Sequence, residues 1–395
     1  MASADLDAVK RRVVEAVDQR AGLLLDVSHR VHGQPELLYE ERFASQLLAS
    51  TLAGAGFDVE LPAFGLETAF AARAGVDGGP AVAVLCEYDA LPGIGHACGH
   101  NVIAAAGLGA ALAAAVVASD AGGRLVALGT PAEEGGGGKV VMGERGAFYG
   151  LEAALMVHPA GVDLAEPDVL AIANFRVDYR GRGAHAAAAP HRGRNALDAA
   201  VLGYNAVAAL RQHIESTDRV HGVFPLAGDK PNIVPDHTVA EWYVRSATSA
   251  GLGPLRDRVM ACLEAGAAAA GCSMEVQSTC PVYSDLRTNR PLLGLYRSNS
   301  EILGRPVPDP TAATRVVAST DMGNVSYLVP SVHPMVKVAP ADVALHTSDF
   351  ARWAVSEEGD RAVLDGAKAM AMTVVDLWLR DDVREEVRAA FDPEP

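Results

Sequence analysis

The feature that most constrains the fold is a series of short apolar segments, each followed by polar and chemically reactive residues. Residues 68–159 contain TAFAARAG, AVAVLCEYDAL, RLVALGTPAEE and AALMVHP, with a long Ala-rich segment after the second of them. Strand-like segments that alternate with helical ones predict an open α/β sheet, and such sheets bind ligands outside the carboxyl ends of their strands. We therefore expect the functional residues where these apolar segments end.

Composition excludes several classes of partner. The longest uncharged stretch, residues 101–119, has nearly the length of a membrane span, but Ala and Gly dominate it, which favours a buried helix packed closely on a sheet. Half of the 395 residues are hydrophobic, which is enough for a substantial core. The formal net charge of −16 gives no electrostatic footprint for nucleic acid or an anionic bilayer. We expect neither a nucleic-acid nor a membrane partner.

The cysteines and the N-terminal residues indicate the cellular compartment. The five cysteines form an odd set without a CxxC pair, which is typical of reduced thiols rather than of a disulfide framework. The first twenty residues, MASADLDAVKRRVVEAVDQR, carry charge every few positions and lack the apolar region of a secretory signal. A cytoplasmic location is therefore expected.

The length favours two domains, and the order of segments places one inside the other. Residues up to 57 show helical spacing. From about residue 170 the order is strand, helix, two strands, helix and strand, which is the ferredoxin-like β-α-β-β-α-β unit. Later segments predict further helices, a strand at HPMVKVA and one final helix over residues 358–387. The expected division is a catalytic domain of residues 1–169 and 284–395, with an inserted domain of residues 170–283.

The segment CEYDALPGIGHACGHN contains the first candidate site. His96, Cys98 and His100 alternate in a Gly-rich turn after a strand, and imidazole and thiolate are ligands for zinc-like metals. Asp89, at the end of the strand, is a candidate for orienting a ligating imidazole. A free cysteine with two incidental histidines is the alternative interpretation, because short His/Cys clusters are suggestive only.

The segment TPAEEGGGGK contains the second candidate site. Glu133 and Glu134 follow a strand, and adjacent carboxylates can divide between metal binding and proton transfer. The glycines suggest a phosphate-binding loop, but its first Gly would fall at Glu133 and Val140 stands where Ser or Thr is required. The GRGAHA segment similarly fails as a dinucleotide motif, because Pro190 intervenes before the next helix.

Two further histidines complete the set. His158 follows a third strand in LMVHP, and His346 precedes a helix in ALHTSDF. A single histidine is more often structural than ligating. Together, however, one thiolate, three imidazoles and one carboxylate in one α/β domain supply about the number of ligands that a pair of metal ions needs.

The sequence resembles the family of two-metal metallopeptidases and amidohydrolases that includes aminoacylases, bacterial glutamate carboxypeptidase, plant auxin-conjugate hydrolases and p-aminobenzoyl-glutamate hydrolases. The EYDALP and STDMGNVS forms resemble most the branch of the p-aminobenzoyl-glutamate hydrolases and the Xaa-basic or β-alanyl dipeptidases. The resemblance covers nearly the whole chain in seven ordered segments: VHGQPELLYEERFASQLLASTL, EYDALPGIGHACGHN, GTPAEEGGGGK, GRGAHAAAAPHRGRNALDA, KPNIVPDHTVAEWYVR, STDMGNVSYLVPSVHP and LHTSDF.

This resemblance implies that Glu133 is the general base and that five residues are metal ligands: Cys98, His100, Glu134, His158 and His346. The implied division has Cys98 bridging, one metal on His100 and His158, and the other on Glu134 and His346. It also implies two divalent ions per subunit, zinc first, with manganese, cobalt and nickel as alternatives.

Two nearby positions complete the implied metal site. Asp89 matches an orienting aspartate. Glu87 stands where many relatives have a metal-binding histidine, a position that His100 is expected to replace.

The resemblance also assigns the inserted domain a role as a lid and dimerisation domain. His185 matches a histidine that relatives send across a dimer interface to polarise the scissile carbonyl, and Asn232 matches an asparagine that helps to hold substrate. We therefore expect a homodimer whose lid closes through hinges near residues 170 and 283. A structural turn residue is the alternative role for His185.

The implied activity is hydrolysis of the amide bond of a dipeptide or an N-acyl amino acid. Two metal ions would activate water and polarise the carbonyl, while Glu133 moves the proton to the departing nitrogen. The alternatives are a catalytically silent binding protein on the same fold and a thiol hydrolase that uses Cys98 and His100. We expect no direct contact between that thiol and that imidazole, taking residues two apart on an extended loop to point in opposite directions.

Overall fold

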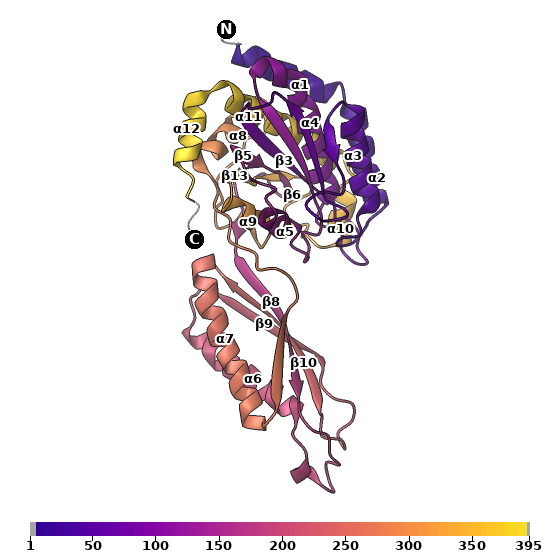
Figure 1. Cartoon of the computed structure of the whole chain (residues 1–395), viewed down its shortest axis with the longest axis vertical. Coiled ribbons are helices and arrows are strands. Elements are labelled where there is room, and N and C mark those ends of the chain that lie inside the picture. The colour runs from indigo at the N-terminus through magenta and orange to yellow at the C-terminus, as the bar shows by residue number, and fades with distance from the viewer. Residues whose placement is uncertain (1–4, 393–395) are drawn as a thin grey trace. The chain divides into compact units, whose positions relative to one another are not determined.

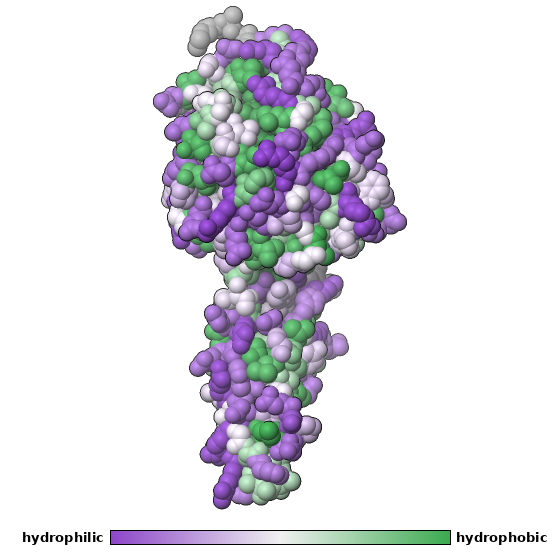
Figure 2. Space-filling view, turned by 90° about the vertical axis from the view of Figure 1, so that its right-hand side faces the viewer, coloured by the Kyte–Doolittle hydropathy of each residue, from purple (hydrophilic) through white to green (hydrophobic). Residues whose placement is uncertain are grey.

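The computed structural model describes residues 5–392, which form two compact units (Figure 1). The larger unit contains residues 5–168 and 286–392, and the smaller unit contains residues 169–285. The expected boundaries at 169/170 and 283/284 lie beside these divisions. Each unit has its own cluster of buried apolar side chains. On the face drawn in Figure 2, hydrophobic residues are scattered among hydrophilic ones on both units.

A mixed six-stranded sheet forms the centre of the larger unit. The strands of this unit are β1 (Asp58–Glu60), β2 (Phe70–Gly75), β3 (Ala81–Glu87), β4 (Arg124–Thr130), β5 (Ala153–Leu155), β6 (His158–Ala160), β12 (Val317–Ala318), β13 (Ser331–Val332) and β14 (Met335–Lys337), and β7 (Asp168–Val169) lies at the division between the units. The sheet order is β1-β2-β4-β3-β5-β13, and β6 pairs separately with β14. β3 runs parallel to β4 and β5, whereas β1 and β2 form an antiparallel edge. The predicted α/β class is confirmed.

Helices surround this sheet. They are α1 (Leu6–Asp18), α2 (Ala21–Gly33), α3 (Arg42–Gly54), α4 (His100–Ala121), α5 (Gly138–Glu144), α8 (Arg290–Ile302), α9 (Met322–Ser326), α10 (Ser348–Trp353), α11 (Glu357–Leu379) and α12 (Asp381–Ala389). The expected helix over residues 358–387 is wrong as one element, because Arg380 adopts an extended conformation that separates α11 from α12. The break turns α12 so that Val383 and Val387 are buried on the core.

The helix α4 packs closely against the sheet, as its composition predicts. Every residue from His100 to Ala114 is buried. Gly107 permits the approach, because a Cβ at this position would lie 2.6 Å from the carbonyl oxygen of Leu85 in β3. By length and composition α4 could cross a membrane, but 83% of its apolar window is buried in this unit, which is how a core helix is arranged.

The smaller unit has the predicted β-α-β-β-α-β order. Its elements are β8 (Ala171–Arg180), α6 (Ala196–Leu210), β9 (Arg219–Leu226), β10 (His237–Ser246), α7 (Ser249–Ala270) and β11 (Ser273–Ser278), with single 3₁₀ turns at Pro190–Arg192 and Arg211–His213. The four strands form an antiparallel sheet in the order β11-β8-β10-β9. Helices α6 and α7 pack on each other and on one face of this sheet, around Trp242 and Tyr179.

The close contact between α6 and α7 depends on Gly266. A Cβ at this position would lie 2.4 Å from both the carbonyl oxygen of Ala199 and the amide nitrogen of Gly203 in α6. We expect Gly266→Ala to lower the free energy of unfolding of this unit by about 1–3 kcal/mol, because the helices must move apart. Gly294→Ala is the control, because Gly294 also lies within a helix, α8, and a Cβ there would meet nothing within 4 Å. The control should be neutral or stabilise by up to about 1 kcal/mol.

Urea unfolding monitored by circular dichroism measures both variants. Equal unfolding midpoints for the Gly266 and Gly294 variants would contradict the close packing of α6 and α7.

Candidate metal centre

Strand ends and the loops that follow them bring together the candidate residues of the larger unit. The sheet places the ends of β3 and β4 side by side, with Glu87 of β3 opposite Thr130 of β4. Each predicted ligand and the predicted base offers an atom to at least one group whose members lie within 4.8 Å of one another. The residues brought together in this way are Cys98, His100, Glu133, Glu134, His158 and His346.

Two of these groups share one residue. Cys98, His100 and His158 form the first group, in which Cys98 Sγ lies 3.5 Å from His158 Nε2. Cys98, Glu134 and His346 form the second, in which His346 Nε2 lies 3.4 Å from Glu134 Oε1. Cys98 Sγ therefore lies within 4.8 Å of a potential ligand atom of each of the other four predicted ligands.

The conformation of Gly99 places Cys98 and His100 on the same side. Gly99 precedes α4 with a φ of 76°, in the left-handed region, and a Cβ there would lie 2.7 Å from Pro159 Cγ. The expectation that residues two apart would point in opposite directions is therefore wrong. Its premise was mistaken, because side chains two apart on an extended segment lie on the same face. Here the chain turns into a helix at Gly99, and both side chains join one ligand group.

Asp89 orients His100, as its position suggests. His100 Nδ1 lies 2.8 Å from the carbonyl oxygen of Asp89 and 3.2 Å from its Oδ1. The other carboxylate oxygen of Asp89 accepts a hydrogen bond of 2.9 Å from the backbone N–H of Glu134. His100 Nε2 is thereby turned towards Glu133 and Glu134, each 3.9 Å away.

Other hydrogen bonds orient the remaining two histidines. His158 Nδ1 bonds to the carbonyl oxygen of Pro159 at 2.8 Å, so its Nε2 faces Cys98. His346 has a φ of 62°, unusual for a residue with a Cβ, and its backbone N–H donates to the carbonyl oxygen of Ala97 at 2.9 Å. This bond ties the loop before α10 to the loop that carries Cys98.

The donor set fits metal ions. His100 Nε2 and Glu134 Oε1 are buried and have no hydrogen-bond partner among the described residues. Buried polar atoms normally have hydrogen-bond partners, so two such atoms in one group of potential ligands fit a cation-binding role. Imidazole, thiolate and carboxylate together are a zinc-like ligand set.

Burial and neighbouring carboxylates shift the pKa values of Glu133 and Cys98. Burial, with the nearby carboxylates of Glu87 and Glu134, raises the pKa of Glu133 well above its ordinary value. Burial also raises the pKa of the Cys98 thiol, and Glu134 adds to this effect. A buried neutral thiol is a poor nucleophile, which argues against a thiol hydrolase.

Three candidates lie outside this cluster. His96 is buried in the larger unit, but its ring centroid lies 6.0 Å from that of His32, and it belongs to no ligand group of the described residues. His185 and Asn232 belong to the smaller unit, where both are exposed. They lie on adjoining segments, since the backbone N–H of Ala186 donates to the carbonyl oxygen of Asn232 at 3.0 Å.

Sequence reasoning missed three buried polar residues beside the cluster. Lys139 is fully buried and its Nζ lies 2.7 Å from Asp321 Oδ1. His333 is also buried, with its ring centroid 5.4 Å from that of His158. The signals were present in the GGGGK, STDMGN and SVHP segments, which carried the resemblance but received no role.

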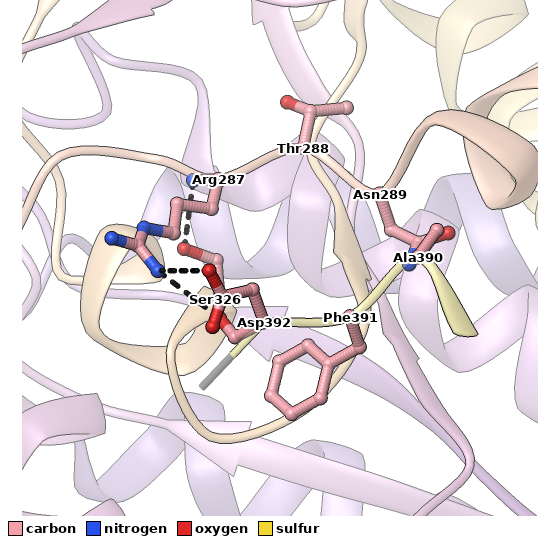
Figure 3. Close-up of a pocket in the computed structure, with 7 residues that line it drawn as sticks. All are labelled: Arg287, Thr288, Asn289, Ser326, Ala390, Phe391 and Asp392. Carbon is pink, nitrogen blue, oxygen red and sulfur yellow. Dashed lines mark hydrogen bonds and ion pairs between the residues drawn. The ribbon is translucent and has the colours of Figure 1, made fainter. Parts of the chain in front are cut away.

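A separate cavity of about 210 Å³ lies where residues 390–392 meet the rest of the larger unit (Figure 3). Arg287 occupies its wall, and its guanidinium donates to the carbonyl oxygen of Asp392 at 3.1 Å. Its backbone N–H donates to Ser326 Oγ at 2.9 Å. None of the ligand groups lines this cavity, whose contacts instead fasten the C-terminal segment.

Comparison with known proteins gives consistent matches. The model of "Peptidase family M20/M25/M40" matches residues 83–352. The Xaa-Arg dipeptidase of Mus musculus is 38% identical over 408 residues, covering 98% of this chain and 93% of that protein. A p-aminobenzoyl-glutamate hydrolase polypeptide of Escherichia coli (strain K12) is 26% identical, covering 96% of this chain and 94% of that protein.

A solved structure shares the fold. The YXEP protein of Bacillus subtilis, described as a dinuclear metal binding peptidase from the M20 family, superposes with a TM-score of 0.70 at 17% identity. The match covers 91% of this chain and 99% of that one.

Proposed function

Since this chain belongs to peptidase family M20/M25/M40 and is an amide-bond hydrolase, we propose that it cleaves a dipeptide or an N-acyl amino acid with two divalent metal ions and Glu133 as general base. The observation that carries the proposal is the sharing of Cys98 by two ligand groups. The YXEP protein, which shares the fold, is described as a dinuclear metal binding peptidase, and this supports the proposal of two ions.

Each residue of the cluster has a proposed role. His100 and His158 would hold one ion, Glu134 and His346 would hold the other, and Cys98 would serve both. Zinc suits these donors best, and manganese, cobalt and nickel are the ions to compare with it.

The mechanism combines metal and carboxylate chemistry. Bound at these residues, two divalent ions would supply Lewis acidity for activating water and polarising the substrate carbonyl. Glu133 accepts a proton from the water and returns it to the leaving nitrogen, a task suited to a carboxylate whose pKa is raised. Asp89 keeps His100 in the orientation that the ligand needs.

The names of the relatives support the substrate class. One is a dipeptidase and one a hydrolase of an acylated glutamate, so both cleave an amide next to an amino acid. We propose a substrate of the same form, with the acyl group and the leaving amino acid to be found by a screen.

Treatment with a chelator tests this function. We expect EDTA or phenanthroline to abolish hydrolysis of dipeptides or N-acyl amino acids, and added Zn, Mn, Co or Ni to restore it. The same preparation should resist iodoacetamide while the metal is bound, because Cys98 would then be coordinated. Activity that survives chelation but not iodoacetamide would support the thiol hydrolase instead. Metal binding without turnover across the screen would support a silent binding protein.

We further propose that His185 acts as an oxyanion donor. Its Nδ1 accepts backbone N–H groups from Ala187 at 3.3 Å and from Ala188 at 3.2 Å. An accepting Nδ1 requires the proton to lie on Nε2, so the exposed ring edge carries the donor that a developing oxyanion needs. Asn232, on the adjoining segment, is proposed to hold the substrate.

A homodimer through the smaller unit is proposed as the assembly. The edge strand β9 exposes Val223 at 62% and Leu226 at 38%, and its outer ladder groups lack a partner strand in the sheet order of this unit. A second copy that pairs with this edge would continue the sheet and cover these side chains.

Mixed dimers test whether His185 serves the partner's site. A His185→Ala subunit combined with a Glu133→Gln subunit should regain activity, because one of the two sites in a mixed dimer has both residues intact. Random exchange at equal input makes half of the dimers mixed, so about a quarter of wild-type activity is expected. Absence of recovery after verified subunit exchange would place His185 in its own chain's site or in none.

A further inference from the structure

Lys139 is a buried cation beside the candidate metal centre that the proposed mechanism does not use. It lies at the start of α5, directly after the four glycines, and its side chain has no exposed surface. A lysine is almost never fully buried unless it is paired. Its partners should therefore reveal its role.

The partners of Lys139 come from two distant parts of the chain. Its backbone N–H donates to Asp321 Oδ2 at 2.9 Å, and its Nζ donates to Asp321 Oδ1 at 2.7 Å. The same Nζ forms an ion pair with Glu87 Oε1 at the end of β3. One residue thus joins the end of β3, the start of α5 and the loop before α9.

The glycines explain how a lysine next to a loop turns inwards. A Cβ at Gly136 would lie 2.5 Å from Ala132 Cβ, and a Cβ at Gly138 would lie 1.8 Å from the carbonyl oxygen of Pro131. The loop can fold back this tightly only without side chains at these positions. The glycines that resemble a phosphate-binding loop therefore bring Lys139 into the interior.

The lysine neutralises a cluster of carboxylates. One oxygen each of Glu87, Glu133 and Asp321 lies within 4.8 Å of the others, a grouping that could hold a cation. Burial alone would lower the pKa of Lys139. The carboxylates of Asp321, Glu87 and Glu133 outweigh this effect and raise the pKa above its ordinary value, so the ammonium stays charged.

Glu87 connects this cluster with the ligand groups. Its Oε1 faces Lys139, whereas its Oε2 lies 3.6 Å from His100 Nε2. Glu133 Oε2 lies 3.9 Å from the same nitrogen. The carboxylate that Lys139 holds therefore faces the same atom as the proposed general base.

We propose that Lys139 is a positioning residue whose ammonium group acts as a built-in cation, holding Glu87 and Asp321 in place beside Glu133 and thereby fixing the orientation of the general base. This inference rests on the proposed function, because it takes Glu133 as the base. Without the ammonium, three like charges would repel one another within 4.8 Å and the base would lose its fixed place.

Replacement of Lys139 by alanine tests the proposal through chemical rescue. We expect kcat to fall about 100-fold, the size of effect that a misplaced catalytic group produces, with KM and metal content unchanged. Propylammonium, which fits the space left by the side chain, should restore at least a tenth of the lost kcat, and tetramethylammonium at equal ionic strength should not. Lys139→Ala with the kcat of the wild type, or a loss of kcat that propylammonium does not relieve, would overturn the proposal.

The matched control is Lys10 of α1, whose Nζ lies 2.7 Å from Oδ2 of the buried Asp376, a residue that belongs to none of the ligand groups. Lys10→Ala should keep the wild-type kcat and show no response to propylammonium.

If Lys139→Ala fails to fold, Asp321→Asn decides the matter, since it removes one carboxylate charge and leaves the lysine in place. We expect kcat to fall at least fivefold with unchanged metal content, and an unchanged kcat would overturn the proposal.

The outcomes separate this inference from the proposed function. A wild-type enzyme that keeps its activity in chelator would refute the metal mechanism itself. A chelator-sensitive enzyme with a fully active Lys139→Ala variant would refute only the role of the lysine.

Discussion

Glu133→Gln is expected to lower kcat by about 10²–10⁴-fold, the usual contribution of a general acid–base group, while both metal ions stay bound. Glutamine keeps the size of the side chain but cannot accept the proton from water. The structure places Glu133 beside His100 at 3.9 Å, in a buried position where nearby carboxylates raise its pKa. Metal analysis and steady-state kinetics on the same preparation measure the two effects.

The neighbouring glutamate provides the control. Glu134 Oε1 lies 3.4 Å from His346 Nε2 in a ligand group, so Glu134→Gln should lower metal content together with activity. The opposite result, metal loss in the Glu133 variant and full occupancy in the Glu134 variant, would mean that the two roles are reversed.

The sequence predicted which segments carry the candidate site residues better than it predicted how their side chains are oriented. Apolar segments ending in reactive residues predicted an α/β sheet, and parallel strands necessarily bring their carboxyl ends to one edge. That argument placed Glu133 and His158 at strand ends, and each belongs to a ligand group that contains His100. It did not predict that Cys98 and His100 join one ligand group, because the directions of two loop side chains depend on backbone angles such as the left-handed turn at Gly99.

Lys139 shows a different kind of limit. Charge patterns place lysines at the surface, and nothing in the residues next to Lys139 predicts its burial. Its partner Asp321 is 182 positions away, and the pairing exists only once α5 and α9 have packed together. A buried ion pair of this kind is a property of the tertiary structure, so local sequence patterns carry little information about it.

The end of the chain illustrates a third limit. Helical spacing runs from residue 358 to residue 387 without Gly or Pro near the break, so the periodicity alone predicts one helix. The structure interrupts it at Arg380, where turning the chain lets Val383 and Val387 of α12 reach the core. Tertiary packing here outweighs helix propensity, which is a weak preference of less than about 1 kcal/mol per residue.

The Cys98→Ser variant is expected to lose both metal ions and nearly all activity. Cys98 belongs to both ligand groups, so its removal weakens two sites at once, and a neutral hydroxyl is a poor ligand for borderline-soft ions. Because burial raises the pKa of this thiol, metal binding must displace its proton, and metal affinity should therefore rise with pH in the wild type more steeply than in the variant.

The comparison with His346 makes this prediction specific. His346 belongs to one ligand group only and its side chain is 53% exposed, so His346→Asn should release one ion and retain the other. Titration with zinc, followed by metal analysis, gives the stoichiometry of each variant. Two ions bound to Cys98→Ser would exclude the thiol as a bridge, and loss of one ion in both variants would place Cys98 in a single site. Loss of two ions with Ser at 98 and of one with Asn at 346 is the pattern that a bridging thiolate requires.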